Sequence, residues 1–211
     1  MIVHLLEYQV ATGHDAEVDS FVRHSALRAP PSPGILARCV GRRLGPVGHE
    51  HVAATEWGDL DSYRLGTAHD GIPEYLASVS ALLRHVRSTR YRVVFSEGPG
   101  LESARILRIY RATVATEMLA AWGRRAAEPI DRLLVIPGME KVITGVGVLA
   151  VDRPGETSIV AITAWRDWEA ILQATGGHID RLLLETELAD IERPLDVAHY
   201  QLPGLKDQPV A

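Results

Sequence analysis

The sequence of 211 residues contains a single cysteine, Cys39, no asparagine, and only 2 lysines beside 20 arginines. One cysteine excludes an intrachain disulfide framework and any zinc site built from a cluster of cysteines. The formal net charge of -5 argues against the basic face that nucleic-acid binding normally needs. The shortage of lysine and asparagine is typical of a GC-rich bacterial genome and indicates no particular chemistry.

Long hydrophobic runs are also missing. No apolar stretch approaches the roughly 20 residues that a membrane-spanning helix needs. The first ten residues, MIVHLLEYQV, lack the basic start and the cleavage site of a secretory signal. We therefore expect a cytoplasmic globular protein whose partners include neither nucleic acid nor a membrane.

The two halves of the chain resemble each other. The matches, at an offset of 104 and later of 108 residues, are Val10-Ala11-Thr12 with Val114-Ala115-Thr116, Pro33-Gly34 with Pro137-Gly138, and Thr55-Glu56-Trp57 with Thr163-Ala164-Trp165. The offset changes within a hairpin connection, where insertions are tolerated. We therefore predict a tandem duplication, with one domain at 1–100, a second at 104–205 and a polar tail at 206–211.

Each half shows the same order of sequence patterns. Alternating, β-branched segments predict strands, and apolar residues at helical spacing predict helices. The predicted strands are 2–10, 35–44, 51–57 and 91–95 in the first half, and 105–114, 139–151, 157–165 and 196–202 in the second. The predicted helices are 14–28 and 73–88, and then 115–134 and 178–191. Asp59 and Asp167 follow the tryptophans and are well placed to cap short additional helices.

The order β-α-β-β-α-β predicts an α+β fold of two ferredoxin-like units, each an antiparallel sheet with helices on one face. The first strand carries apolar residues on both faces: Leu6 and Tyr8 on one, Val3 and Leu5 on the other. A sheet that is apolar on both faces needs a second layer. We expect the two sheets to cover each other as an α+β barrel within one chain, either as a monomeric pseudo-dimer or as a homodimer of it.

At this point the sequence resembles the antibiotic biosynthesis monooxygenase family of the dimeric α+β barrel superfamily. The resemblance rests on the opening VHLLEYQV, on Pro33-Gly34, on the Thr-Glu-Trp-Gly-Asp and Thr-Ala-Trp-Arg-Asp motifs, and on the final VAHYQL strand. It implies a cavity between the sheet and its helices. Some members of that family oxidise quinol-like aromatic polyketides with dioxygen and no cofactor, others bind and degrade haem, and others have no established activity.

The haem-degrading members use an asparagine on the first strand, a tryptophan that ends the third strand and a histidine on the helix that follows. Here the tryptophan matches at Trp57 and Trp165, whereas the asparagine positions hold Leu6 and Tyr110. The histidine positions hold Gly66 and Ala174, although His69 and His178 lie a few residues later. We therefore expect no cofactor, haem being disfavoured, and no histidine spacing indicates a metal site.

The resemblance leads us to expect a small-molecule binding protein that acts as a cofactor-independent monooxygenase on an aromatic, polyketide-like substrate with dioxygen. A histidine or tyrosine would remove a proton from the substrate, and the electron-rich anion would react with oxygen. We expect Tyr110, Trp165 and His178 of the second half as catalytic residues. The expected substrate-binding residues are Trp57, Tyr8, His4, His51 and His199.

Two alternatives remain open at this point: a non-catalytic ligand-binding or structural protein on the same fold, and a haem-binding or haem-degrading protein. Each of the chosen residues also fits a purely structural role. A buried tryptophan removes about 150–250 Å² from water, which is reason enough for Trp57 and Trp165 to lie where a strand meets a helix. A strand histidine is more often paired or exposed than catalytic.

Overall fold

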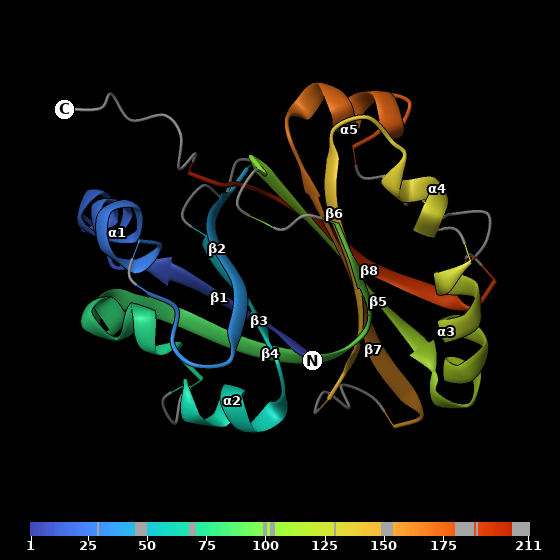
Figure 1. Ribbon diagram of the computed structural model, residues 1–211, viewed down its shortest axis with the longest axis horizontal. Helices are drawn as coiled ribbons and strands as arrows, with labels where there is room; N and C mark the ends of the chain where they lie inside the picture. The colour runs from blue at the N-terminus through green and yellow to red at the C-terminus, as the bar shows by residue number, and fades with distance from the viewer. Residues whose placement is uncertain are drawn as a thin grey trace. The chain divides into compact units, whose positions relative to one another are not determined.

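The computed structural model describes residues 1–28, 30–44, 50–67, 71–98, 101, 104–128, 130–148, 154–179, 188 and 190–203. Figure 1 shows the course of the chain. Within these residues, no helix is both long enough and apolar enough to cross a membrane.

Contacts within the chain divide it into two units, Met1–Arg90 with the chain from Tyr200 onward, and Tyr91–His199. The first runs β1 (Ile2–Val10), α1 (Asp15–Phe21), η1 (Val22–Ala26), β2 (Ile35–Arg43), β3 (Glu50–Trp57), α2 (Leu60–Leu65), η2 (Glu74–Leu82) and the start of β4 (Leu83–Glu97). The second runs from the rest of β4 through β5 (Ile106–Ala115), η3 (Thr116–Met118), α3 (Leu119–Ala127), α4 (Ile130–Leu134), β6 (Met139–Gly147), β7 (Glu156–Trp165) and α5 (Trp168–Ala174) to β8 (Glu192–Gln201).

The order of hydrogen-bonded strands contains the ferredoxin-like order twice, β4-β1-β3-β2 and β8-β5-β7-β6. Strand β4 continues into the second unit, where its residues from Tyr91 onward pair with β6. Strand β8 ends in the first unit, where Tyr200 and Gln201 pair with β2. The predicted α+β fold of two tandem units is therefore confirmed. By contacts the division falls inside β4 and β8, and the domain bounds at 1–100 and 104–205 stay predictions.

The local geometry at the end of the third strand repeats. Gly34 and Gly138 both have positive φ values, of 86° and 84°, and their carbonyl groups accept hydrogen bonds from Gly58 N at 2.9 Å and Arg166 N at 2.8 Å. Glycine is needed there because a Cβ at Gly34 would lie 2.3 Å from the side chain of Ser62. The Pro-Gly matches in the sequence thus mark the same turn twice.

The helices after the two tryptophans begin with the same cap. The Asp59 carboxylate accepts a hydrogen bond from Ser62 N at 2.7 Å, and the Asp167 carboxylate accepts one from Ala170 N at 2.8 Å. These bonds satisfy free N–H groups of the first helical turn, and they lower the pKa of both carboxyls. Both predicted caps are present.

The prediction of a helix over 73–88 is wrong in its second part. The 3₁₀ helix η2 ends at Leu82, and β4 begins at Leu83 and runs for 15 residues. The basic run from Arg84 to Arg87 therefore lies in a strand, where Val86, Thr89 and the residues beyond favour extended backbone. The corresponding helix predicted at 178–191 and the predicted tail at 206–211 lie largely or wholly outside the described residues.

In each unit the hydrophobic core lies between the sheet and its helices. The first core joins Leu6 and Ala53 of the sheet to Val18 of α1 and Leu76 of η2. In the second unit, α3, α4 and α5 lie along one side of the strands (Figure 1), and one core cluster gathers around Trp122 and another around Trp165. The face of each sheet that meets these helices is called here the helix-covered face.

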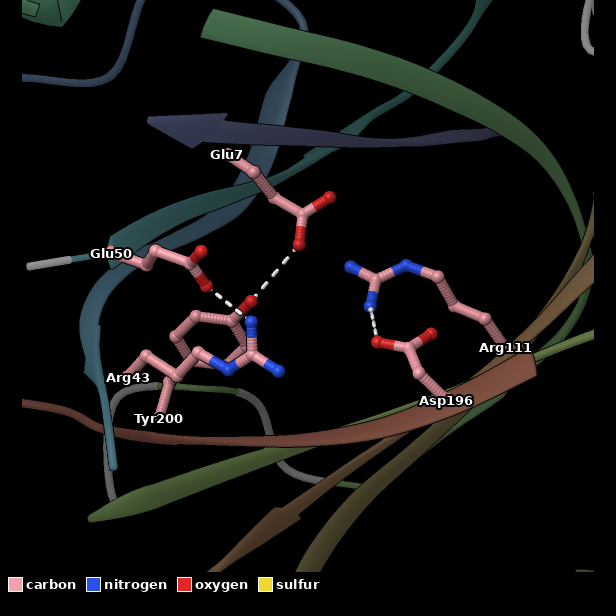
Figure 2. Close-up of polar contacts among 6 residues, drawn as sticks. All are labelled: Glu7, Arg43, Glu50, Arg111, Asp196 and Tyr200. Carbon is pink, nitrogen blue, oxygen red and sulfur yellow. Dashed lines mark hydrogen bonds and ion pairs between the residues drawn. The ribbon is translucent and has the colours of Figure 1, made fainter. Parts of the chain in front are cut away.

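The opposite face carries polar pairs (Figure 2). In the first unit, the Tyr200 hydroxyl donates to Glu7 Oε1 at 2.9 Å, and Arg43 forms an ion pair with Glu50. The bond from Tyr200 fastens the end of β8 to the first strand of this unit. In the second unit, the buried Arg111 forms an ion pair with Asp196 at 3.0 Å.

Candidate functional site

The helix-covered face of the first unit carries four of the residues that were predicted to bind substrate. In the register of β1 and β3, Ile2 pairs with Trp57, His4 with Thr55 and Tyr8 with His51. Alternate residues of a strand share a face, so His4, Tyr8, His51 and Trp57 lie on one side of the sheet. All four are buried, with at most 3% of the side chain exposed.

His4 is a neutral, buried imidazole that contacts one residue of the surface. It has no exposed surface, and its Nε2 atom lies 2.9 Å from Oγ of Ser88, an exposed residue of β4. Its ring meets the ring of Tyr63 edge-on at 5.1 Å. Burial, with a smaller contribution from the charge of Arg90, lowers the pKa of His4 to about 3. The ring is therefore uncharged at neutral pH.

Trp57 lies beside the same tyrosine. Its indole meets the Tyr63 ring edge-on at 5.9 Å, and the Arg90 guanidinium lies over that ring at 5.3 Å. Tyr63 comes from α2, which the Asp59 cap starts directly after β3. We call His4, Trp57, Tyr63, Ser88 and Arg90 the His4 cluster.

Several buried polar atoms on this face have no hydrogen-bond partner within the described part of the chain: His4 Nδ1, Trp57 Nε1 and Tyr8 Oη. Leaving such an atom unpaired costs about 1–3 kcal/mol, and native proteins keep few of them. An unpaired donor and an unpaired imidazole nitrogen beside one aromatic ring are suited to a small molecule that supplies the missing bonds.

The far end of the same face holds a second polar group. The His51 ring stacks on Tyr8 with centroids 5.4 Å apart, and its Nε2 atom lies 3.6 Å from Asp19 Oδ1. This polar contact lowers the pKa of the Asp19 carboxyl, and the charges of Arg23 and Arg42 lower it further. Four residues of strand separate His4 from Tyr8, about 13 Å, so the two ends are distinct.

Between the two ends, Tyr75 of η2 crosses over the sheet. Its hydroxyl and the hydroxyl of Thr55 are 2.8 Å apart, and Arg38 stacks on its ring at 5.0 Å. Burial raises the pKa of the Tyr75 phenol, so it remains protonated. The Thr55 hydroxyl therefore already has a hydrogen-bond partner.

In the second unit Trp165, Tyr110 and Trp122 are paired, whereas Thr144 Oγ1 on the same face is buried without a partner among the described residues. Trp165 Nε1 donates to Thr163 Oγ1 at 2.8 Å. Glu192 accepts from the Tyr110 hydroxyl at 2.7 Å and from Trp122 Nε1 at 2.6 Å. Burial raises the pKa of both the Tyr110 phenol and the Glu192 carboxyl. A ligand on this face would have to replace bonds that the protein already makes.

The structure does not bring the three predicted catalytic residues together. Tyr110 and Trp165 belong to separate core clusters, and His178 is exposed in the turn after α5. His199, the fifth predicted substrate-binding residue, is buried against Trp168, with ring centroids 5.1 Å apart. The functional roles of these residues stay predictions.

The sequence analysis missed Tyr63, Ser88 and Arg90. Ser88 fell at the end of a predicted helix, although Ser-Thr-Arg-Tyr-Arg-Val from residue 88 onward has the alternation of a strand. Tyr63 lies one helical turn after Leu60 in the capped helix, which marked it as a residue that packs against the sheet. The alternation in β4 was the one signal that could have placed Ser88 and Arg90 beside β1.

The first unit has no room for a haem-ligating histidine at the position that the resembling family uses. A Cβ at Gly66, the position of the ligating histidine in haem-degrading members of the resembling family, would lie 2.3 Å from a ring carbon of Trp57. A histidine therefore has no room there. The described residues also contain no group of three His, Cys, Asp or Glu side chains placed to hold a metal ion. His69 lies outside the described residues.

No protein-family model matches the sequence, and no curated protein matches it either. Among solved structures, a proposed monooxygenase of Fusobacterium nucleatum is 11% identical with a TM-score of 0.71, over 95% of this chain and 91% of that one. An anthrone oxidase-like protein is 11% identical with a TM-score of 0.64, over 96% and 91%. A Listeria monocytogenes ferredoxin-fold protein related to antibiotic biosynthesis monooxygenases is 10% identical with a TM-score of 0.51, over 94% of both chains. At such identities the likeness establishes the fold, and this chain has the duplicated ferredoxin-like fold of these proteins.

Proposed function

We propose that the protein binds a small aromatic molecule with a hydroxyl or carbonyl group at the His4 cluster, and that it acts on this molecule as a cofactor-independent monooxygenase. One observation carries the proposal: His4 Nδ1 and Trp57 Nε1 are buried beside Tyr63 without a partner among the described residues. The proposal moves the catalytic residues from the second half to the first, where most of the substrate-binding residues were expected. The likeness in fold supports the class of reaction, and the position of the site rests on the residues of this chain.

The chemistry of the cluster suits a flat, weakly acidic ligand. Trp57 supplies an N–H donor for a carbonyl or phenolate oxygen, and the neutral His4 accepts a proton from the substrate. The substrate anion then gives electrons to dioxygen. For an anthrone, two hydrogens leave the CH₂ carbon, one oxygen atom becomes the new carbonyl, and the other leaves as water. The reaction is balanced by dioxygen alone as oxidant.

A second function, ligand binding without catalysis, is favoured by the same histidine. A base whose pKa is about 3 has little driving force to take a proton at neutral pH, whereas it remains a good hydrogen-bond acceptor. On this hypothesis the cluster holds the ligand through the same two atoms and no oxygen is consumed.

The test combines binding and oxygen uptake. Isothermal titration with 1,8-dihydroxyanthraquinone measures binding, and an oxygen electrode with 1,8-dihydroxyanthrone measures turnover above the rate in buffer. Loss of a buried hydrogen bond of about 1.4 kcal/mol should weaken binding about 10-fold in Trp57→Phe. Trp165→Phe is the matched control and should bind as the wild type does.

The outcomes separate the hypotheses. Uptake of one dioxygen per quinone formed supports the monooxygenase, and binding without uptake supports the non-catalytic ligand-binding protein. If Trp165→Phe weakens binding and Trp57→Phe does not, the site lies in the second unit and the assignment to the His4 cluster is wrong.

A further inference from the structure

We infer that the Ser88 hydroxyl is the proton outlet of the His4 cluster: a proton taken up at His4 Nδ1 is matched by one released from Nε2 through Ser88 Oγ to solvent. The inference rests on the proposed function, because it describes how the same site disposes of the substrate proton. Ser88 would not touch the ligand itself. Its role would be to position the proton that leaves His4.

The geometry provides one path between the buried ring and water. His4 has no exposed surface, and its Nε2 atom lies 2.9 Å from Ser88 Oγ. Ser88 is exposed on β4. The opposite nitrogen, Nδ1, is buried and has no hydrogen-bond partner within the described residues, so it is the nitrogen left for the proposed ligand. The imidazole thus separates the proposed ligand position from the surface, with one nitrogen toward each.

The surroundings of His4 oppose a stable imidazolium. Burial and the Arg90 charge, which lies over the neighbouring Tyr63 ring, both disfavour the charged form. A proton that arrives at Nδ1 must therefore leave from Nε2 in the same event. The substrate bond to hydrogen breaks as Nδ1–H forms, Nε2–H breaks as a new Ser88 O–H forms, and the original hydroxyl proton passes to water. The ring changes its tautomer and stays neutral.

The hydroxyl is held in place by close packing. A Cβ added at Gly71, whose φ is +77°, would lie 2.5 Å from Ser88 Oγ. The backbone at Gly71 therefore lies directly against the Ser88 side chain and restricts its rotation. Only glycine combines this backbone conformation with this closeness.

Among the described residues of the second unit, an arginine takes the place of His4. Register aligns Arg108 with His4, because Arg108 pairs with Thr163 as His4 pairs with Thr55. Arg108 Nε donates to the carbonyl of Ile179 at 3.3 Å. An arginine keeps its proton throughout the physiological range, so it cannot exchange tautomers.

The first experiment reads the imidazole without turnover. Long-range ¹H–¹⁵N spectra of ¹⁵N-histidine protein give the tautomer of His4, assigned by loss of its signals in His4→Gln. We expect the Nε2–H form in the wild type and a shift of population toward Nδ1–H in Ser88→Ala. An Nδ1–H form in the wild type, or a tautomer that Ser88→Ala leaves unchanged, would overturn the relay.

The second experiment follows oxidation of 1,8-dihydroxyanthrone. Removing an acid–base relay costs about 100-fold, so kcat should fall by about that factor in Ser88→Ala while KM stays within about twofold. Ser88→Thr keeps a hydroxyl and should restore most of kcat, and the proton inventory should be curved for the wild type and linear for Ser88→Ala. Unchanged kcat in Ser88→Ala overturns the relay alone. A wild type without turnover overturns the monooxygenase and the relay with it.

Discussion

The two units place a threonine and a tryptophan at the same positions and use them differently. In the second unit, Thr163 accepts the indole N–H of Trp165 at 2.8 Å. In the first, the hydroxyl of Thr55 is bonded to Tyr75 instead, and the indole N–H of Trp57 has no acceptor within the described residues. Shared residues therefore build the shared fold, while the partner of the threonine hydroxyl differs between the units.

The contrast extends beyond the two tryptophans, although Thr144 Oγ1 of the second unit is also buried without a partner in the described residues. In the second unit one buried carboxylate, Glu192, satisfies both Tyr110 and Trp122. In the first unit, His4 and Tyr8 keep polar atoms without a partner in the described part of the chain. The second unit gains stability from a closed network, and the first gives up part of that stability, as functional sites commonly do.

The largest expected effect concerns acid stability and His4. The pKa of His4 is about 3 in the folded protein and about 6.5 when unfolded. Between these values the unfolded chain binds a proton that the folded chain does not, so the free energy of unfolding falls as the pH falls. At 1.36 kcal/mol per pH unit the loss is on the order of 5 kcal/mol from pH 6.5 to pH 3.

Urea denaturation at several pH values checks this prediction. His4→Gln should be less dependent on pH than the wild type by about one proton between pH 3 and 6.5. His178→Gln, at an exposed histidine of the second unit, is the matched control and should follow the wild type. Parallel curves for the wild type and His4→Gln would show that burial of His4 does not weaken the folded protein at low pH.

The second effect concerns the buried hydrogen bonds that Glu192 accepts in the second unit. Glu192→Ala removes the acceptor of two buried donors, each of which costs about 1–3 kcal/mol when left unpaired, so we expect a loss of about 3 kcal/mol in unfolding free energy. Adding Tyr110→Phe to this variant removes one of the stranded donors and should recover about 1 kcal/mol. Urea denaturation measures both, and the exposed Asp190→Ala serves as a control with little change. A loss of unfolding free energy no larger than in that control would mean that the Glu192 network does not stabilise the second unit.

Sequence reasoning predicted the fold because the fold depends on repeated local signals. The Pro-Gly turns at Gly34 and Gly138, the caps at Asp59 and Asp167, and the strand patterns all act over a few residues. It missed the length of β4, because Arg84 to Arg87 suit either a helix end or an exposed strand, and only pairing with neighbouring strands decides between them.

The hydrogen bonding of the candidate site could not be predicted from such local signals. The sequence shows that His4 and Trp57 exist on neighbouring strands, and alternation places both on one face. Whether their polar atoms have partners depends on the positions of Tyr75, Ser88 and Tyr63, which belong to other elements of the chain. Thr55 and Thr163 look equivalent in sequence, but Thr55 is bonded to Tyr75 and Thr163 to Trp165.

The smallest expected effect tests this last difference directly. Trp57 and Trp165 are both fully buried at the end of the third strand, so replacing either with phenylalanine loses similar contact area. Trp165→Phe also loses the bond to Thr163, which is worth about 1 kcal/mol net, whereas Trp57→Phe loses no protein hydrogen bond seen in the described residues. Urea denaturation of the two variants should therefore differ by about 1 kcal/mol, with Trp165→Phe the less stable. Equal losses would mean that the Trp57 N–H donates a hydrogen bond within the protein. Because an indole has a single N–H donor, the case for a ligand at Trp57 would then fail.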